Sequence, residues 1–255
     1  MIAVVGGTGT AGRPAVEALL AAGREVRILS RSSPESLPDG AEHRRLDLTR
    51  DDPAESLSGA DVLLDLANSS SRPGKVLLDG TSRLLRACER AGIKHYVGIS
   101  IVGCERVGLG YYKAKTRQEQ LIRESPVESS LLRASQFHEL VDGLMSVTAR
   151  AGFVLSGEAL LQPIASEAVG ARLALIAQNP PLNGVEQITG PEVRTLTELA
   201  DAWRQATGRA WFKLRLPLPG RTGRALKDGV LTDAAASTPG VGFSEWLAGR
   251  YRWTV

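Results

Sequence analysis

The stretch Val4–Pro14, VVGGTGTAGRP, places four glycines between a short apolar run and a helical pattern. A packed core gives no reason for this, because glycine contributes no buried area and costs conformational entropy on folding. A phosphate group does give one, because only glycine lets backbone N–H groups come within contact distance of it. The alternative is a glycine-rich turn without a ligand. We therefore expect this loop to hold a pyrophosphate at a helix N-terminus.

The spacing of these glycines fits two related dinucleotide-binding fingerprints. G-x-G-x-x-G runs from Gly7 to Gly12, and G-x-x-G-x-x-G runs from Gly6 to Gly12. Either spacing is a weak signal alone, but here a strand pattern ends at Val5 and a helix pattern opens near Ala11. The Gly-Lys-Ser/Thr sequence of a P-loop is absent from the stretch, which excludes that class of nucleotide site.

Short apolar runs alternate with helical patterns over the first half of the chain. Strands are expected at residues 2–6, 25–31, 42–48, 60–67, 94–100 and 127–135, and helices at 11–23, 74–92 and 113–125. Alternation at this rhythm predicts right-handed βαβ crossovers and a parallel sheet with helices on both faces. The fold class is α/β, with a Rossmann-type doubly wound sheet.

The alternation loosens after about Gln136. Helices are expected at 167–180, 195–208 and 243–253, and a strand at 211–220. We expect a NAD(P)-binding domain over residues 1–140 and a smaller C-terminal α/β subdomain over 141–255, continuous with the first and without a clear linker. In open α/β sheets ligands bind outside the carboxyl ends of the strands, so this subdomain is expected to complete a substrate pocket.

Composition excludes several classes of function. The 255 residues are 43% hydrophobic and 23% charged, as in an ordinary globular protein, and the net charge of +3 is not clustered, so no nucleic acid partner is expected. No apolar stretch reaches the roughly 18 residues of a membrane span, and no signal peptide is apparent, so we expect a cytoplasmic protein. Scattered histidines and the unpatterned Cys88 and Cys104 predict no metal site. Oligomeric state, monomer or homodimer, stays open.

The end of the second expected strand bears on the choice of cofactor. An NAD site usually has Asp or Glu there, bonded to the ribose 2′-hydroxyl, whereas this chain has Ser30, Arg31 and Ser32. A guanidinium with hydroxyl neighbours suits a 2′-phosphate in charge and geometry, and Arg13 can lie on the same side. The alternative is that Arg31 is a solvated loop arginine. We expect NADP(H) to be preferred over NAD(H).

Five segments in this order, GGTGTAGRPAVEALLAAG, RRLDL, VGISIVG, YYKAK and LLRASQFHEL, resemble those of atypical short-chain dehydrogenases/reductases. The chain is most similar to the NmrA-like NAD(P)H-binding group, over about its first 140 residues. The resemblance implies that the loop glycines line the pyrophosphate, that Asp47 and Leu48 lie beside the adenine, and that Ala67 and Asn68 lie along the nicotinamide ribose. The expected cofactor-binding residues are Gly6, Thr8, Gly9, Thr10, Ala11, Gly12, Arg13, Arg31, Ser32, Asp47, Leu48, Ala67, Asn68 and Lys115.

The same resemblance implies that Ser100, Tyr111 and Lys115 stand at the catalytic Ser and Tyr-x-x-x-Lys positions, although Ser100 lies slightly close to Tyr111 in sequence. Tyr111 and Lys115 are four apart and share a helix face, so the ammonium is expected to lower the Tyr111 pKa. Such a tyrosine can donate a proton to a carbonyl oxygen. Tyr112 with Lys115 is a competing pair, and a solvated basic helix is the alternative to any catalytic role.

Three residues after the sixth expected strand, Gln136, Phe137 and His138, are expected to line the substrate pocket. A single histidine there is more often a structural group than a base. The whole pattern predicts an NADPH-dependent oxidoreductase acting on a small carbonyl, quinone or conjugated-ene substrate. The alternative is a non-catalytic NADP(H)-binding redox sensor of the NmrA type that controls a partner protein. A sugar-nucleotide epimerase ranks last, because that class usually has a larger substrate domain.

Overall fold

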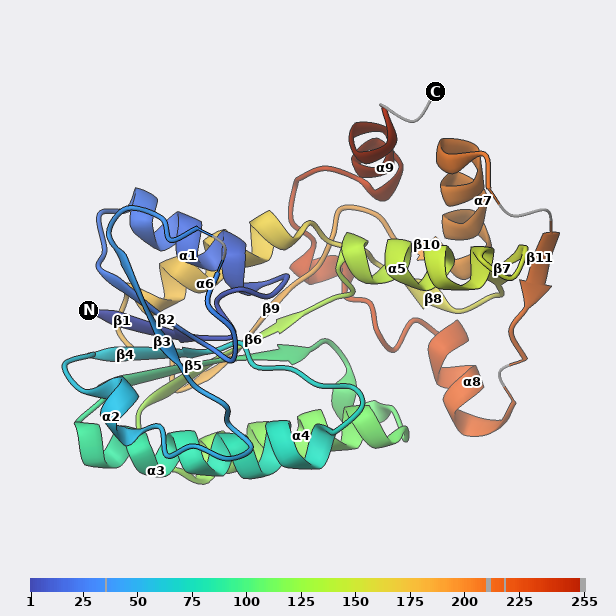
Figure 1. Ribbon diagram of the computed structural model, residues 1–255. Coiled ribbons are helices and arrows are strands. Elements are labelled where there is room, and N and C mark those ends of the chain that lie inside the picture. Colours follow the sequence, from blue (N-terminus) through green and yellow to red (C-terminus); the bar gives the residue numbers. More distant parts are fainter. Residues whose placement is uncertain (35, 210–211, 218, 253–255) are drawn as a thin grey trace. The chain divides into compact units, whose positions relative to one another are not determined.

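A seven-stranded sheet in the order β3-β2-β1-β4-β5-β6-β9 organises the computed structural model, which describes residues 1–34, 36–209, 212–217 and 219–252 (Figure 1). The strands are β1 (Ile2–Val5), β2 (Val26–Ser30), β3 (Ala41–Arg45), β4 (Val62–Asp65), β5 (His95–Ile101), β6 (Ser129–Ala134) and β9 (Gly184–Ile188). The pairs β1–β2, β1–β4, β2–β3 and β4–β5 are parallel. The order reverses between β1 and β4, as in a doubly wound fold. The predicted fold class and its first six strands are confirmed.

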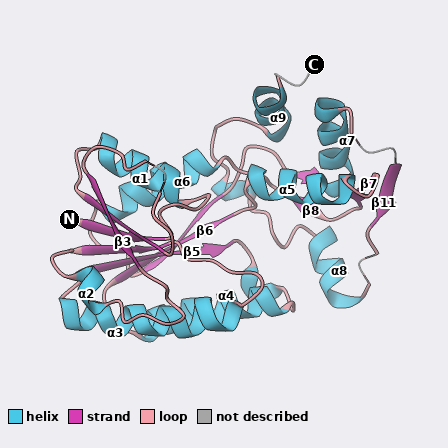
Figure 2. Ribbon diagram, viewed as in Figure 1, coloured by secondary structure: helices cyan, strands magenta, loops and turns pink. Residues whose placement is uncertain are grey.

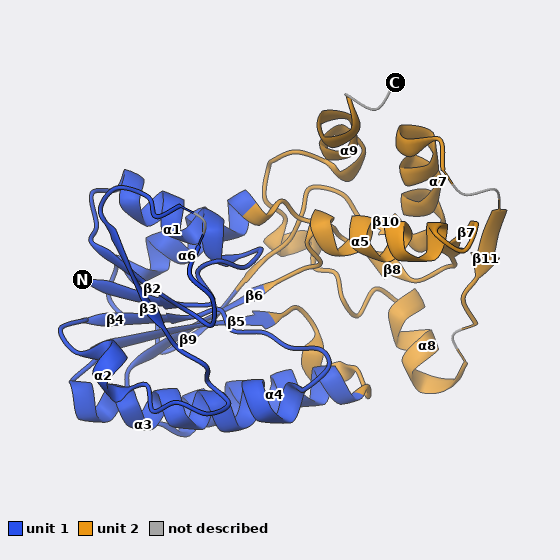
Figure 3. Cartoon of the chain, viewed as in Figure 1, with its two compact units in different colours: residues 1–100, 110–133, 167–186 blue, residues 101–109, 134–166, 187–255 orange. Residues whose placement is uncertain are grey.

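The described residues divide into two compact units, coloured separately in Figure 3. Unit 1 comprises residues 1–100, 110–133 and 167–186, and unit 2 comprises residues 101–109, 134–166 and 187–255. Both units are therefore discontinuous in sequence. The boundary expected at residue 140 lies near the change of unit at residue 134, but the chain returns to unit 1 over residues 167–186.

Helices cover both faces of the sheet in unit 1. One face carries α1 (Gly12–Ala21) and α6 (Ser166–Ala177); the other carries α2 (Ala54–Leu57), α3 (Thr81–Ala91) and α4 (Gly110–Glu124) (Figures 1 and 2). A π-helical turn, η1 (Gly74–Gly80), leads into α3. A Cβ atom added to Gly170 of α6 would lie 2.5 Å from the Pro14 Cβ atom, so glycine is what lets α6 approach α1.

The core of unit 1 on the side of α3 is a cluster of buried, mostly apolar side chains. It includes Val5 of β1, Leu29 of β2, Leu63 of β4 and Leu84 of α3, all buried. Cys88 belongs to the same cluster, and burial raises the pKa of its thiol to about 12. Cys88 is therefore an inert core residue at neutral pH.

Unit 2 contains α5 (His138–Ala149), α7 (Leu196–Thr207), α8 (Gly220–Lys227) and α9 (Phe243–Tyr251). Its short strands pair as β7 (Phe153–Ser156) with β11 (Phe212–Arg215) and as β8 (Leu160–Leu161) with β10 (Arg194–Thr195). Short 3-10 turns occupy Cys104–Arg106 and Ala234–Ala236. Trp211 and Trp253, at the ends of two expected elements, lie outside the described residues.

A buried carboxylate ties the helices of unit 2 together. Asp142 of α5 accepts hydrogen bonds from the Trp203 indole of α7 at 2.7 Å and from the Tyr251 hydroxyl of α9 at 2.6 Å. Arg250 adds an ion pair at 3.0 Å. The surrounding core is apolar and includes Met145 and Leu247. Because Trp203 comes from α7 and both Tyr251 and Arg250 come from α9, Asp142 fixes the packing of α5, α7 and α9.

Candidate cofactor and catalytic site

The glycine loop joins the end of β1 to the start of α1 with very little space. Gly6 adopts a φ of +74°, and its N–H donates to the Leu29 carbonyl at 2.9 Å. A Cβ atom on Gly12 would lie only 2.1 Å from the Gly6 carbonyl oxygen. A side chain at Gly12 would therefore push the helix away from the strand end.

The N-terminus of α1 is suited to an anion. Ala11 is its N-cap residue and provides no side-chain hydrogen bond, and the first turn contains no acidic residue. The first N–H groups of a helix have no intrahelical acceptor, and the helix dipole favours negative charge there. The close glycine turn and this uncapped helix end fit the pyrophosphate of a dinucleotide.

Two arginines flank the loop. Arg13 donates from Nε to the Thr8 carbonyl at 3.0 Å, so its guanidinium is tied to the loop itself. Arg31 follows β2 and is exposed, and its charge helps to lower the pKa of Asp47. The Ser30 hydroxyl donates to the Ser32 carbonyl at 2.7 Å and so stabilises the backbone turn that contains Arg31. The end of β2 thus presents a cation where an NAD site usually presents a carboxylate.

The loop after β3 holds the two residues expected beside an adenine. The Asp47 carboxylate accepts from the Thr49 hydroxyl at 2.7 Å and from the Thr49 N–H at 2.9 Å. These bonds lower the pKa of Asp47, so it is ionised at neutral pH. Sequence reasoning missed Arg83 of α3, which donates to the Leu48 carbonyl at 2.8 Å. No motif marks Arg83, because its partner is a backbone atom far away in sequence.

Tyr111 and Asn68 are brought together from two segments. Tyr111 lies in the first turn of α4, and its hydroxyl donates to the Asn68 Oδ1 atom, just beyond β4, at 2.8 Å. Burial raises the pKa of Tyr111. The lowered pKa expected from Lys115 is therefore wrong for this structure, because desolvation dominates and the Lys115 ammonium is bonded elsewhere. Tyr111 is a protonated phenol at neutral pH.

Lys115 lies one turn further along α4 and is buried, with 2% of its surface exposed. Its Nζ atom donates to the Ile99 carbonyl at 3.0 Å and to the Gln118 Oε1 atom at 3.0 Å. Ile99 belongs to β5, so the ammonium is fastened to the strand that precedes α4 in sequence. The chain thus holds a buried cation at a defined position in unit 1.

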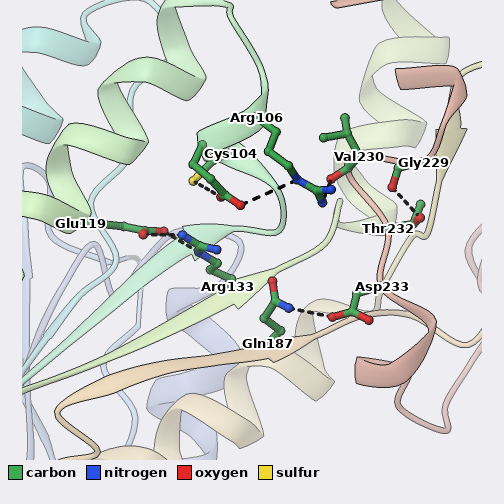
Figure 4. A network of polar contacts seen from close by, with 10 residues as sticks. Cys104, Arg106, Glu119, Arg133, Gln187, Gly229, Val230, Thr232 and Asp233 are labelled. Atoms are coloured by element: carbon green, nitrogen blue, oxygen red, sulfur yellow. Dashed lines mark hydrogen bonds and ion pairs between the residues drawn. The ribbon is translucent and has the colours of Figure 1, made fainter. Parts of the chain in front are cut away.

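Ser100 is also buried, and its hydroxyl donates to the Glu119 carboxylate. Arg133 of β6 binds both oxygens of the same carboxylate, at 2.8 Å and 2.7 Å (Figure 4), and Arg123 binds at 2.6 Å. Burial raises the pKa of Glu119, but the arginines and Ser100 outweigh it and leave the pKa below its usual range. In this structure Ser100 supports an ionised Glu119.

The three expected pocket residues lie in unit 2, two of them bonded to backbone. Gln136 donates to the Leu231 carbonyl at 3.2 Å and accepts from the Gln162 N–H at 3.1 Å. The His138 ring donates from Nε2 to the Val241 carbonyl at 2.9 Å. Phe137 is half-buried and is the N-cap residue of α5. Their role in binding a substrate stays a prediction.

Within the part of the chain that the structure describes, no three His, Cys, Asp or Glu side chains are grouped as a metal site would need. Over the same residues, no helix has both the length and the apolar character to cross a membrane.

Comparison with known proteins agrees with this geometry. A model of the NAD(P)H-binding family matches residues 6–177. An uncharacterized protein of Mycobacterium tuberculosis, Rv2047c, is 35% identical over 92 residues, which is 36% of this chain but 11% of that protein. The chain therefore spans about a tenth of the length of the curated relatives it matches.

Two solved structures illustrate the fold. The NADPH-dependent quinone oxidoreductase QOR2 of Escherichia coli, complexed with NADPH, has a TM-score of 0.79 at 18% identity, covering 98% of this chain and 100% of that one. A nucleoside-diphosphate-sugar epimerase of Staphylococcus aureus has a TM-score of 0.77 at 16% identity, covering 96% and 99%. At such identities the similarity concerns the fold.

Proposed function

Because the chain belongs to the NAD(P)H-binding family, we propose that it is an NADPH-dependent oxidoreductase that reduces a small carbonyl, quinone or conjugated-ene substrate. One observation carries the proposal: a protonated Tyr111, bonded to Asn68, precedes a buried Lys115 by one turn on the same helix. Asn68 follows β4, next to the point where the strand order reverses and where ligands of this fold bind.

The cofactor supplies the hydride, and the residues of the chain handle the proton. Tyr111 is protonated at neutral pH and can donate its phenolic proton to the substrate oxygen. Lys115, held to the Ile99 carbonyl, stabilises the negative charge that the tyrosine acquires when it gives up the proton. Ser100, if it leaves Glu119, orients the substrate oxygen. Gln136, Phe137 and His138 are proposed to line the substrate side.

The glycine loop, Arg13, Asp47, Leu48 and Ala67 are proposed as the remaining contacts of the cofactor. These residues are proposed to bind successive parts of the cofactor. The adenine would lie after β3, the pyrophosphate in the middle of the cofactor at the start of α1, and the nicotinamide ribose after β4. The exposed Arg31, with Ser32, is proposed to bind the 2′-phosphate, which gives NADPH its advantage over NADH.

Replacing Arg31 by alanine is expected to raise the Kd for NADPH by about 10- to 100-fold, the worth of a hydrogen-bonded charge pair. The Kd for NADH should change by less than about twofold, because NADH has no 2′-phosphate to lose its partner. Fluorescence titration with both cofactors measures this, with Arg90→Ala as a control for an exposed arginine that pairs with Asp52. Equal affinity for the two cofactors in both the wild type and Arg31→Ala would rule out the assignment.

A second function, a redox sensor that binds NADP(H) without turnover, is favoured by one observation. The Ser100 hydroxyl is committed to Glu119, so one member of the expected catalytic set is engaged in the core. An epimerase shares the fold and the Tyr-x-x-x-Lys spacing, but that class usually has a larger substrate domain. The reductase is preferred because a sensor has no need of the Tyr111–Lys115 spacing.

The test follows NADPH in one cuvette, first its binding by fluorescence and then its oxidation in the presence of quinones, small carbonyls and conjugated enes. Oxidation that depends on one of these substrates would support the reductase. Tight binding with no oxidation across the panel would favour the sensor, and the next step would be a search for a protein partner that binds only one redox form.

A further inference from the structure

A buried polar cluster lies among four elements of unit 1, and of its members only Lys115 has a role in the reaction outlined above. Its members come from β4, α3, β5 and α4, and each is at most 4% exposed. They are Asp65, Thr81, Tyr96, Lys115 and Gln118. Burying this many polar groups is costly unless they bond to one another, so their arrangement calls for a reason.

Asp65 is surrounded by hydrogen-bond donors. Its Oδ2 atom accepts from the Tyr96 hydroxyl at 2.6 Å, the Thr81 hydroxyl at 3.2 Å and the Gln118 Nε2 atom at 3.4 Å. Its Oδ1 atom accepts from the Ala67 N–H at 3.1 Å. Burial raises the pKa of Asp65, and the hydrogen bond from Tyr96, the charge of Lys115 and the bonds from Ala67 and Thr81 act against that rise. An ionised carboxylate only accepts, so these convergent donors favour the charged form of Asp65.

Lys115 presents the complementary arrangement. The acceptors of its Nζ atom described above, the Ile99 carbonyl and the Gln118 Oε1 atom, are neutral. The charge of Lys115 also interacts with Asp65, whose pKa it lowers against the effect of burial. Gln118 spans the two, because its Oε1 atom accepts from Lys115 while its Nε2 atom donates to Thr81 at 2.9 Å and to Asp65.

We propose that Gln118 is a positioning residue that links the carboxylate of Asp65 to the ammonium of Lys115, so that the lysine keeps both its charge and its place while buried. An amide is suited to this link because one end accepts and the other donates. The significance of the link for turnover rests on the proposed function, in which Lys115 stabilises the tyrosine. The existence of the link between Asp65, Gln118 and Lys115 does not depend on the proposed function.

Other titratable groups around the cluster do not supply this charge. Burial raises the pKa of Tyr96 well above its ordinary value and that of Cys88 to about 12, so both stay neutral. Tyr111, on the same helix, is likewise a neutral phenol with a raised pKa. Glu119, also on α4, is paired with Arg133 and Arg123. Asp65 is the acidic group of the cluster whose charged form its hydrogen-bond donors and the Lys115 charge favour against the effect of burial.

The test is a direct titration of Lys115 in the full-length protein. The chain has six lysines, so 13C,15N-lysine labelling gives few signals, and Lys115→Arg assigns the one in question. Gln118→Leu keeps roughly the size of the side chain but removes its bonds to Lys115, Asp65 and Thr81. Asp65→Asn removes the charge and turns one accepting oxygen into a donor. Gln120→Leu, an exposed glutamine on the same helix, is the matched control.

In Gln118→Leu and in Asp65→Asn, the midpoint of the Lys115 titration is expected to fall by about one pH unit or more, a tenfold change in proton affinity. Gln120→Leu should titrate as the wild type does. Two independent variants guard against one that fails to fold, and Thr81→Val interrupts the link at a third point. A Lys115 midpoint within about 0.3 pH units of the wild type in the folded variants would overturn the proposal.

Oxidation of NADPH, measured against pH in the same proteins, separates this inference from the proposed function. If the reductase proposal holds as well, the alkaline limit of turnover moves to lower pH in Gln118→Leu and Asp65→Asn. A shifted Lys115 titration without turnover in any protein, wild type included, would leave the link standing and reject the reductase. Turnover in the wild type with an unshifted Lys115 titration in the variants would support the reductase and reject the link.

Discussion

Replacement of Tyr111 by phenylalanine is expected to lower kcat for NADPH oxidation by about 10²- to 10⁴-fold, the usual contribution of a positioned proton donor. The phenyl ring keeps the packing of the first turn of α4, including its edge contact with Tyr112 at 5.8 Å between ring centroids. Only the hydroxyl that donates to Asn68 is lost. The Kd for NADPH should therefore change by less than about threefold, since a single neutral hydrogen bond contributes little to net stability.

Tyr112→Phe is the matched control, since it removes a hydroxyl from the neighbouring residue on the same helix. It should retain most of the activity. Loss of turnover in Tyr112→Phe with full turnover in Tyr111→Phe would assign the proton donor to the competing pair of Tyr112 and Lys115. Full turnover in both variants would place the proton donor outside this helix.

Gly12→Ala is expected to weaken NADPH binding by more than about 100-fold and to lower the free energy of unfolding by about 3 kcal/mol, at the upper end of overpacking costs. The added Cβ atom would lie 2.1 Å from the Gly6 carbonyl oxygen and 2.7 Å from two Gly7 backbone atoms. Because all three are backbone atoms, no rotamer change relieves the clash. Either α1 moves away or the loop opens, and both displace the N–H groups that would bind the pyrophosphate.

Fluorescence titration and denaturant unfolding measure the two effects separately. Gly143→Ala, in the exposed middle of α5 with no atom within 4 Å of the added Cβ, is the control. It should bind NADPH as the wild type does and be slightly more stable, because alanine favours a helix interior. Wild-type affinity in Gly12→Ala would show that the loop does not hold the cofactor.

Much of the fold of unit 1 could be predicted because its central strands β1, β2, β4 and β5 are mostly buried on both faces. Such strands are continuous apolar runs, as in β1, where all four residues are buried. The glycines between β1 and α1 then indicated the candidate site, since a close backbone approach requires glycine in the sequence. The same holds for α7, whose capping box of Thr195 and Glu198 and whose C-cap, Gly208, bound the predicted helix.

The elements that were missed lack such a signal. No element was predicted at α5, because its apolar residues lie on all sides: Val141 and Met145 are buried, whereas Leu140 and Val147 are more than 60% exposed. No helical period results from that pattern. β9 was missed because only Ile188, at its end, is buried.

The buried cluster around Asp65 was not predictable for a different reason. Its members come from four elements, and neither Gln118 nor Thr81 has a sequence neighbour that indicates its partner. The prediction that the Tyr111 pKa is lowered was wrong for the same reason. The four-residue spacing to Lys115 shows that the two side chains share a helix face, but it does not show to which atoms the ammonium is bonded. Long-range polar contacts need the coordinates.

The return of the chain to unit 1 over residues 167–186 limits how this protein can be recombined with its relatives. A truncation after residue 140 would delete β9 from the sheet and remove α6, the helix whose Gly170 lies against Pro14. Exchanging the C-terminal parts of two such proteins at a single crossover would therefore leave the nucleotide-binding part incomplete. A working chimaera has to keep the recipient's own residues 167–186 and graft the donor sequence as separate inserts on either side of them.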